Sequence, residues 1–325
     1  MFNALIIGAG SIGALKDDKF DSPNNPDKVL THAHAFYKHP YIRLQCVIDR
    51  EYKKARLAAK KWGSEWAIDS CGVSHVLTAY PFDIVSVCTP TETHRDIVQS
   101  ICEAEHKPKV LIIEKPCGSN LGECIDIQNM CSAHNIPVIV PYIRRFIPEL
   151  IELKKFIDTC GVIYGATIYY NRGLYRDGCH AIDFSRFLFG KFIQGCSLSG
   201  EGIPDYSKDD LTCSYRLTFA RCDNVIMHAV DGRVGSIFEM DIITENGRIR
   251  LADNYARIYG SYIEREPIYG NYNRYEPHFE CFRDTQLHRG LDFMAQNAID
   301  VINGFQPKCG IDDALAVHEI IEEIK

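Results

Sequence analysis

The lysine best placed in this sequence to transfer a proton is Lys115. It stands in the triplet Glu114-Lys115-Pro116, directly after the apolar run Val110–Ile113, which has the pattern of a buried parallel strand. A side chain at the carboxyl end of such a strand projects into the crevice where open α/β sheets bind ligands. Partial burial beside a cationic ligand would lower the pKa of the amine and suit it to acid–base work, whereas without that context a lysine here is simply solvated.

A histidine later in the chain has the chemistry to act with this lysine. His180 lies at the start of a predicted helix, three residues after Asp177 and three before Asp183. Imidazole changes charge near neutral pH, so His180 could be a second acid–base group. Asp183 could orient the ring or bind a substrate hydroxyl, or it could only stabilise the first turn of the helix. The competing interpretation is a packed or capping histidine with carboxylate neighbours.

A cofactor is indicated by the segment Gly8-Ala9-Gly10-Ser11-Ile12-Gly13, which follows the apolar run Ala4–Ile7 and is predicted to open a helix. Its first two glycines would let the backbone turn and approach a pyrophosphate, and the third would let helix and strand pack closely. Free N–H groups at the start of the helix, including those of Ser11 and Ile12, attract an anion. We therefore predict dinucleotide binding here in preference to a tight turn without a ligand.

An acidic residue at the end of the second predicted strand, Asp49, is expected to bind the ribose of that dinucleotide. A carboxylate there accepts hydrogen bonds from both ribose hydroxyls and favours NAD over NADP. Asp49 lies 36 residues after Gly13, where about 20 are usual, and Arg50 beside it could meet a 2′-phosphate, so NADP stays open. The extra length is the charged segment from Lys16 to Val29, which we interpret as a solvated loop in preference to a flap beside the cofactor.

Further cofactor contacts are expected after another buried strand, Asp83–Cys88. This position is again the carboxyl end of a strand, where ligands sit in open α/β sheets. Glu114 and Lys115, at the end of the next strand, complete the set. The expected contacts after Asp83–Cys88 are Thr89, Pro90, Thr91 and His94.

These residues require a scaffold that brings several strand ends together, and the first 140 residues predict one. Apolar strands alternate with amphipathic helices, which implies a parallel sheet covered on both faces, a doubly wound α/β Rossmann domain. After about Tyr142 the pattern changes to strands joined without helices, with a tight hairpin turn at Asn246-Gly247. We predict domains of residues 1–142 and 143–325, the second an α+β domain with a large, mostly antiparallel open sheet.

The predicted elements can be given as ranges. The strands are Ala4–Ile7, Ile42–Ile48, Asp83–Cys88, Val110–Ile113, Pro137–Val140, Val162–Tyr170, Leu211–Phe219, Val225–Val230 and Ile237–Thr244. The helices are Glu51–Trp62, Glu92–Glu105, Leu121–His134, Ala181–Phe189, Leu287–Asn303 and Ile311–Ile324.

Composition narrows the class of protein. The 325 residues include 36 Lys and Arg against 43 Asp and Glu, a net charge of −7, and no basic run exceeds a pair, so nucleic-acid binding is not expected. No apolar stretch reaches the ~18–20 residues of a membrane span, and the N-terminus lacks the basic region of a signal peptide. The 14 cysteines include no Cys-x-x-Cys pair, so we expect no metal site, and reduced thiols in a cytoplasmic protein.

Taken together, the motifs resemble the glucose–fructose oxidoreductase / inositol dehydrogenase family, known as Gfo/Idh/MocA. The resemblance implies a Rossmann domain, an open-sheet domain that also forms the oligomer interface, and NAD(P)-linked oxidation or reduction of a sugar, polyol or related carbonyl. It also implies that Lys115 and His180 flank the substrate carbon. The segments that carry it are Gly8–Gly13, Thr89-Pro90 with His94, Glu114-Lys115-Pro116, Arg144-Arg145-Phe146, His180-x-x-Asp183, and Gly304–Pro307 with Asp312–Leu315.

The chain departs from the family pattern at two positions. An aspartate often stands four residues before the histidine, but here Arg176 occupies that position and Asp177 follows it; Ile143 stands where an asparagine often precedes the double arginine. Because guanidinium groups pair bidentately with phosphate or carboxylate, we hypothesise an anionic substrate such as a nucleotide-linked sugar; solvated or ion-paired arginines are the alternative. Beside Lys115 and His180, the candidates for catalysis or substrate binding are Asp177, Asp183, Arg176, Tyr142, Arg144 and Arg172.

Three functions are compatible with this sequence. The first is an NAD(P)-dependent dehydrogenase or reductase acting on CH–OH, with a small sugar-like substrate. The second is an enzyme with tightly bound NAD that performs epimerisation or elimination through a transient ketone. The third is a non-catalytic dinucleotide-binding scaffold or sensor, which the arginine at position 176 favours and the retained Lys115 and His180 oppose. Late tyrosines, six of them between residues 255 and 275, could mark a subunit interface, and we expect a homodimer or homotetramer through the C-terminal sheet.

Overall fold

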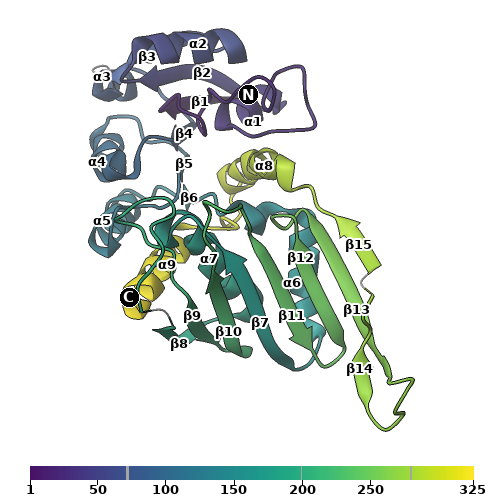
Figure 1. Ribbon diagram of the computed structural model, residues 1–325. Helices are drawn as coiled ribbons and strands as arrows, with labels where there is room; N and C mark the ends of the chain where they lie inside the picture. Colours follow the sequence, from purple (N-terminus) through teal and green to yellow (C-terminus); the bar gives the residue numbers. More distant parts are fainter. Residues whose placement is uncertain (71–72, 199, 279) are drawn as a thin grey trace. The chain divides into compact units, whose positions relative to one another are not determined.

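The computed structural model describes residues 1–70, 73–198, 200–278 and 280–325 (Figure 1). The chain divides into two compact units, which we call the Rossmann unit (residues 1–146 with 288–318) and the sheet unit (residues 147–287 with 319–325). The predicted division into domains of residues 1–142 and 143–325 stays a prediction, because compact packing does not test which residues function independently.

The Rossmann unit is built on a six-stranded parallel sheet in the order β3-β2-β1-β4-β5-β6, which confirms the predicted doubly wound fold. The residues of β4 and β5 are all buried, as strands with helices on both faces require. The strand order reverses between β1 and β4, and open α/β sheets bind ligands outside the carboxyl ends at this point. The strands are β1 (Phe2–Ile7), β2 (Ile42–Asp49), β3 (Trp66–Asp69), β4 (Ile84–Val87), β5 (Val110–Ile113) and β6 (Val138–Ile139).

Local sequence signals mark where two helices of this unit begin or end. Gly63 adopts the left-handed conformation (φ 67°) that closes α2, and the side chain of Asn120 accepts a hydrogen bond from the amide of Glu123 at the start of α5. Strand β3 and helix α3 were not predicted, since both are short and only partly buried and so carry no strong apolar period. The helices are α2 (Tyr52–Trp62), α3 (Val73–Ala79), α4 (His94–Glu103), α5 (Leu121–Ala133) and α8 (Gly290–Ile302).

The helix predicted directly after the glycine motif is interrupted, which corrects the sequence analysis. Residues 10–14 form a single turn. The chain then leaves the helix and re-enters it at α1 (His32–Lys38), whose first two amides donate to the carbonyls of Ile12 and Gly13 (3.1 and 2.9 Å). Residues 16–31 are therefore an insertion into one helix. Without these sixteen residues the gap of 36 residues between Gly13 and Asp49 falls to 20, the usual spacing for a dinucleotide site.

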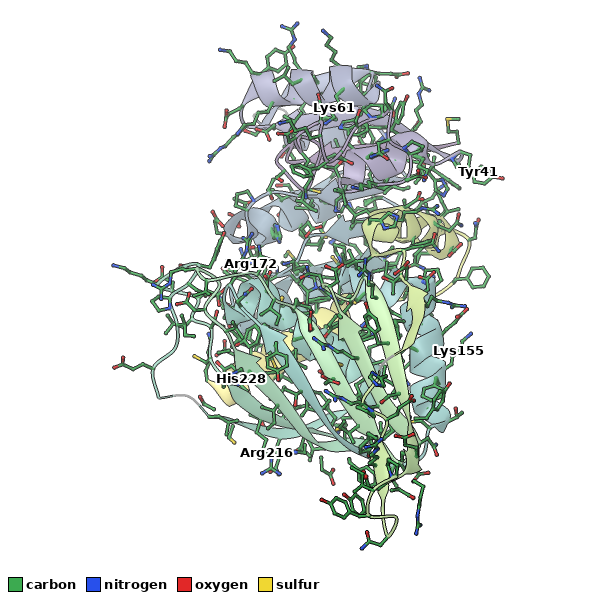
Figure 2. All side chains as sticks on the ribbon, turned by 45° about the vertical axis from the view of Figure 1, so that its right-hand side comes forward. Tyr41, Lys61, Lys155, Arg172, Arg216 and His228 are labelled. Atoms are coloured by element: carbon green, nitrogen blue, oxygen red, sulfur yellow. The ribbon has the colours of Figure 1, made fainter. Side chains whose placement is uncertain are left out.

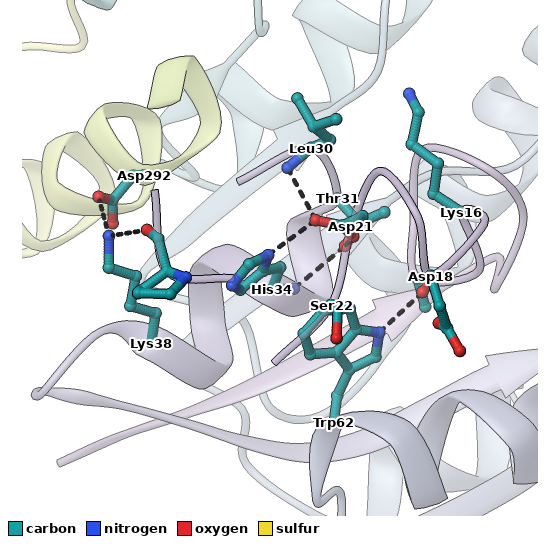
Figure 3. Close-up of polar contacts among 12 residues, drawn as sticks. Lys16, Asp18, Asp21, Ser22, Leu30, Thr31, His34, Lys38, Trp62 and Asp292 are labelled. Atoms are coloured by element: carbon teal, nitrogen blue, oxygen red, sulfur yellow. Dashed lines mark hydrogen bonds and ion pairs between the residues drawn. The ribbon is translucent and has the colours of Figure 1, made fainter. Parts of the chain in front are cut away.

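Polar contacts at several points along the inserted segment hold it against the rest of the Rossmann unit (Figure 3). Asp21 is fully buried and bonds to residues around the start of α1. The amine of Lys61 donates to the backbone carbonyls of Lys16 and Asp21 (3.0 and 2.7 Å). The side chain of Lys38 reaches the carbonyl of Pro26 (2.9 Å) and the carboxylate of Asp292 on α8 (3.0 Å). The loop is thus held at defined points, while residues 17–20, 24 and 26–28 are exposed to solvent as predicted.

The sheet unit contains a nine-stranded sheet in the order β14-β13-β12-β11-β7-β10-β9-β8, with β15 also pairing with β13. Among the described strands of this sheet only β7 and β10 pair in parallel, which confirms the predicted mostly antiparallel sheet. The strands are β7 (Ile163–Tyr170), β8 (Phe192–Ser197), β9 (Tyr215–Phe219), β10 (Cys222–Ala229), β11 (Glu239–Thr244), β12 (Gly247–Ala252), β13 (Arg257–Arg265), β14 (Asn273–Tyr275) and β15 (Glu280–Asp284).

Three further helices complete the chain: α6 (Pro148–Thr159), α7 (Cys179–Phe189) and α9 (Ile311–Ile324). The predicted hairpin joins β11 and β12, but its two turn residues are Glu245 and Asn246, because Gly247 already pairs with Thr244 in the ladder. Gly190 ends α7 as predicted, with its amide bonded to the carbonyl of Arg186. Helix α6 was not predicted. No helix in the described part of the chain is long and apolar enough to cross a membrane.

Candidate functional site

A cavity of about 610 Å³ opens at the carboxyl ends of β1 and β4, within the Rossmann unit. It lies where the reversal of strand order predicts a ligand crevice. Six of the residues predicted to bind a cofactor line it, namely Gly8, Gly10, Asp49, Arg50, Thr89 and Pro90. The sequence analysis did not identify the lining side chains of Lys54, Ser70, Ser74, Glu92, Thr93 and Asp96, although polar residues in the first turn after a strand end are a usual sign of such a site.

The three glycines have different structural roles, and together they fit a pyrophosphate. Gly8 has φ 100°, and a Cβ there would lie 2.7 Å from the carbonyl carbon and oxygen of Cys88. A Cβ at Gly13 would collide with the carbonyl oxygen of Gly8. A Cβ at Gly10 would meet no atom within 4 Å, so the space beside Gly10 opens into the cavity. Gly8 and Gly13 thus make the turn and the close packing, and Gly10 leaves room for a ligand at the backbone.

The carboxylate of Asp49 is fixed in place by two backbone amides. One oxygen accepts from the amide of Ala9 in the glycine motif (2.8 Å), and the other accepts from the amide of Glu51 (2.8 Å). Asp49 therefore faces the cavity in a single orientation next to the glycine turn, as a ribose-binding carboxylate must. The neighbouring Arg50 is exposed, and Lys54 is paired with Glu51 (2.6 Å).

The residues after β4 divide into those that line the cavity and one that supports them. Thr89 and Pro90 line it, and Thr93 donates to the hydroxyl of Thr89 (2.8 Å). His94 is fully buried, and its ring nitrogens lie 2.9 Å from the carbonyl oxygen of Thr89 and 3.1 Å from that of Cys117. His94 thus joins the end of β4 to the segment after Lys115. The cofactor contacts of all these residues, and those of Thr91, Ser11 and Ile12, stay predictions.

Lys115 follows β5, and its neighbour Glu114 is held by a buried histidine. One oxygen of Glu114 lies 2.8 Å from Nε2 of His32, and the other accepts from the amide of Lys115 (3.2 Å). Nδ1 of His32 lies 2.8 Å from the hydroxyl of Ser86 on β4. Burial lowers the pKa of His32, but the contacts with Cys88 and Glu114 outweigh that effect and raise it to about 10. Sequence reasoning missed His32 because the insertion separates it from the glycine motif.

Two predicted substrate residues of the Rossmann unit, Tyr142 and Arg144, follow β6. Both are buried, as is the adjacent Arg145. Arg145 forms an ion pair with Asp313 (3.0 Å), within the same unit. Its charge is therefore balanced inside the protein, as the ion-pair alternative proposed.

The remaining predicted residues belong to the sheet unit, where Arg172 (labelled in Figure 2) and Asp177 bind each other. Two nitrogens of Arg172 lie 2.8 and 2.7 Å from the same oxygen of Asp177. Arg172 has φ 62°, a conformation that costs energy for a side chain other than glycine, and Asp205 accepts a hydrogen bond from its amide (2.8 Å). The guanidinium of Arg176 lies 4.0 Å from the ring centroid of Tyr206. Asp177 is thus committed to an arginine and is not a free carboxylate.

His180 and Asp183 both lie in the first half of α7. Asp183 is buried and His180 is half-buried. Because Lys115 lies in the Rossmann unit and His180 in the sheet unit, their joint action on a substrate stays a prediction. Among the described residues no group of three or more His, Cys, Asp or Glu side chains could hold a metal ion.

The part of the chain that lines this cavity matches a known protein family. Residues 2–142 match the model of a family described as "Oxidoreductase family, NAD-binding Rossmann fold". Residues 2–142 of this chain thus match the Gfo/Idh/MocA oxidoreductase family. The predicted resemblance to this family and the predicted NAD-binding Rossmann fold are therefore confirmed over residues 2–142, and the cofactor contacts of the glycine motif and of Asp49 stay predictions.

Curated relatives in the Gfo/Idh/MocA family match part of the chain. A scyllo-inositol 2-dehydrogenase (NAD(+)) of Bacillus subtilis (strain 168) is 31% identical over 169 residues, which are 51% of this chain and 46% of the relative. An inositol 2-dehydrogenase of Rhizobium meliloti (strain 1021) is 27% identical over 57% of this chain and 54% of its own length. The chain spans about half the length of the curated relatives it matches.

Solved structures share the whole fold at low sequence identity. A levoglucosan dehydrogenase in complex with NADH and levoglucosan has a TM-score of 0.76 at 16% identity, covering 99% of this chain and 96% of that one. A putative myo-inositol dehydrogenase from Sinorhizobium meliloti 1021 has a TM-score of 0.73 at 21% identity, covering 100% of this chain and 96% of that one. This likeness shows that the two-part fold of the family extends over the entire chain.

Proposed function

We propose that this protein is an NAD-dependent oxidoreductase that interconverts a CH–OH group of a sugar or polyol and the corresponding carbonyl. The observation that carries the proposal is the cavity lined by the glycine turn and by the fixed carboxylate of Asp49, with Lys115 at the end of β5 beside β4. The names of similar proteins support the substrate class, because they include inositol dehydrogenases and a levoglucosan dehydrogenase.

In this proposal the chain supplies alignment and proton transfer. Bound NAD supplies a nicotinamide ring that accepts hydride, with its electron pair, from the carbon that carries the hydroxyl. Asp49 accepts hydrogen bonds from the ribose hydroxyls, and its negative charge disfavours the 2′-phosphate of NADP. Lys115 takes the proton of the hydroxyl as the C–H bond breaks, and in the reverse direction returns it. We assign to His180 a second hydrogen bond to the same hydroxyl.

The charges around the predicted arginines favour a neutral substrate. Arg172 is neutralised by Asp177, and Arg145 by Asp313. An anionic or nucleotide-linked sugar would have to compete with these carboxylates for the guanidinium groups. We therefore propose a neutral polyol as substrate, and a charged sugar as the second candidate, which a parallel turnover screen distinguishes.

We further propose that two copies of the chain associate through the sheet of the sheet unit. Exposed aromatic side chains on its strands, Tyr164 and Tyr169 on β7 and Tyr262 on β13, support this interface. Aromatic residues are enriched where protein surfaces bury each other. Sedimentation of the protein and of Tyr164→Asp tests it: a dimer that the variant dissociates is expected, and a monomeric native chain would contradict it.

The experiment that tests the proposed function is a turnover screen combined with cofactor titration. We expect NADH to bind in the micromolar range and NADPH more weakly, and a polyol in the screen to reduce NAD. Lys115→Met should lower turnover about 10²- to 10⁴-fold, the usual contribution of a general acid or base, and leave NADH affinity unchanged. Lys109→Met is the matched control, because Lys109 precedes the same strand β5 at its other end and pairs with Asp83 at the surface.

Other outcomes separate the competing functions. Tight binding of NADH without turnover, and with Lys115→Met indistinguishable from the native protein, would identify the chain as a dinucleotide-binding scaffold. Dinucleotide that remains bound through purification, with conversion of a polyol but no net NADH, would identify epimerisation or elimination. Failure to bind either dinucleotide would refute the oxidoreductase proposal.

A further inference from the structure

His32 connects three segments whose positions relative to one another matter for the proposed reaction. Its backbone amide donates to the carbonyl of Ile12 in the glycine turn (3.1 Å). Its ring reaches the hydroxyl of Ser86 on β4 (2.8 Å) and the carboxylate of Glu114 after β5 (2.8 Å). The side chain is fully buried, so these contacts are shielded from water and worth more than the same contacts at the surface.

The carboxylate of Glu114 passes this constraint to Lys115. Both of its oxygens are engaged, one by His32 and one by the amide of Lys115 (3.2 Å), and the amide of Glu114 itself donates to Val87 on β4 (3.0 Å). Without His32, the buried carboxylate of Glu114 would lose this hydrogen-bond partner. It would then rotate towards water, since a buried charge without a partner is costly. This movement displaces the backbone from which Lys115 extends.

The second histidine of α1 shows that a buried histidine beside a carboxylate does not by itself influence Lys115. His34 is equally buried, and its Nδ1 lies 2.7 Å from a carboxylate oxygen of Asp21. Residues two apart on a helix do not face each other, so His34 is directed to the inserted segment (Figure 3) and His32 to the sheet. The chain thus contains a natural pair of similar contacts, only one of which leads to Lys115.

We propose that His32 is a positioning residue, which acts through Glu114 to fix the backbone at Lys115 and to join it to the glycine turn. The proposal rests on the catalytic role of Lys115 proposed above. In this proposal α1, where the interrupted helix resumes, has a part in the reaction. Neither the glycine motif nor the Glu-Lys-Pro triplet reveals that part.

The test compares His32→Gln with His34→Gln. We expect His32→Gln to lower kcat about 10- to 100-fold, since displacement of a catalytic group by about 1 Å can cost that much, with the Kd for NADH changed less than threefold. Its solvent deuterium isotope effect on kcat should rise, because proton transfer becomes slower. His34→Gln should reduce thermal stability but leave kcat within twofold and the isotope effect unchanged. A loss of correctly folded protein alone would lower kcat without changing the isotope effect.

A double-mutant cycle identifies the residue through which His32 acts. In protein that already carries Lys115→Met, His32→Gln should reduce the residual rate no further, because coupled residues are not additive. Independent, additive losses would overturn the proposal, as would equal effects of the two histidine variants. If His32→Gln does not fold, Glu114→Gln, which keeps the size of the side chain, should show the same raised isotope effect, and its absence would overturn the proposal.

A readout without turnover separates this proposal from the proposed function. In protein labelled with ¹³C at the lysine ε carbons, the Lys115 signal is assigned by its disappearance in Lys115→Met. His32→Gln should shift that signal and His34→Gln should not. If no polyol is oxidised but the shift is seen, the proposed function fails and the positioning contact stands. If turnover is found and the signal does not move, the positioning contact is refuted.

Discussion

Replacing Asp21 by alanine should destabilise the protein strongly, although Asp21 lies in an inserted segment far from the expected chemistry. Its carboxylate is fully buried and accepts hydrogen bonds from the amide of Leu30 (3.1 Å), the hydroxyl of Thr31 (2.6 Å) and the ring of His34 (2.7 Å). All three donors lie at the start of α1, where the interrupted helix resumes (Figure 3). Asp21 thus fixes the return of the insertion to the helix.

The magnitude follows from what the substitution leaves behind. A hydrogen bond to a charged group contributes about 1.5–3 kcal/mol, and Asp21 accepts three of them. Alanine leaves a space that water can enter to satisfy part of the three donors, so we expect Asp21→Ala to lower the free energy of unfolding by about 3–4 kcal/mol. The control is Asp18→Ala in the same segment: Asp18 is 81% exposed and pairs with Lys61 (2.7 Å). It should cost less than about 1 kcal/mol.

Urea unfolding of both variants at pH 7 gives the comparison, and acid gives an independent check. Burial raises the pKa of Asp21, but the hydrogen bonds from His34, Thr31 and Leu30 outweigh it, and the net pKa lies below the usual 3.8. A carboxyl group with a lowered folded-state pKa stabilises the protein fully above its unfolded pKa and loses that effect as the pH falls through the folded value. The difference between native protein and Asp21→Ala should therefore shrink below about pH 4. Equal costs for Asp21→Ala and Asp18→Ala, or a difference unchanged in acid, would refute this reasoning.

Three further predictions concern the cofactor site. Deletion of residues 16–31, which joins Leu15 to His32, should leave the calorimetric Kd for NADH within about threefold of the native value. None of the described lining residues of the cavity comes from that segment, and the hydrogen bonds of the rejoined helix then follow ordinary spacing. A loss of affinity above tenfold would show that the insertion contacts the cofactor. Gly13→Ala should prevent stable folding in a thermal unfolding assay, whereas Gly10→Ala should fold normally and bind NADH more weakly, since only the first added Cβ collides with protein; equal melting temperatures would contradict this. Asp49→Asn should weaken NADH about tenfold, or about 1.4 kcal/mol, and leave NADPH unchanged or tighter; parallel losses for both dinucleotides would show that Asp49 does not discriminate.

The parts of the fold that the sequence could predict are those with a strong periodic signal. β5 and α9 have the predicted bounds, Val110–Ile113 and Ile311–Ile324, because a continuous buried run and a long amphipathic repeat are unambiguous. Strand β3 and helix α3 have four and seven residues, too few for a period to emerge. The Asn-Gly of the second unit correctly indicated a hairpin, but the ladder extends to Gly247 and moves the turn by one residue.

The residues of the site likewise fall into those that the sequence could predict and those that it could not. Gly8, Gly10 and Asp49 could be identified because each has a role set by backbone geometry at a strand end, which a motif encodes. The pairing of Arg172 with Asp177 could not, since it depends on a left-handed backbone at Arg172 that Asp205, 33 residues away, helps to hold. His32 shows the same limit: its partner Glu114 is 82 residues away, and nothing in the local sequence indicates that contact.

The position of the insertion explains how a cofactor motif tolerates sixteen additional residues. The turn at residues 10–14 already contains the amides that are predicted to bind a pyrophosphate, and α1 supplies the packing of the helix against the sheet. Because the amides of His32 and Ala33 bond to the carbonyls of Ile12 and Gly13, the second part of the helix keeps the register that an uninterrupted helix would have. An insertion one turn earlier would separate Gly10 from Gly13, and one later would move His32 away from Glu114. Between Leu15 and His32 the chain can lengthen without displacing either the cradle or the contact to the Lys115 triplet.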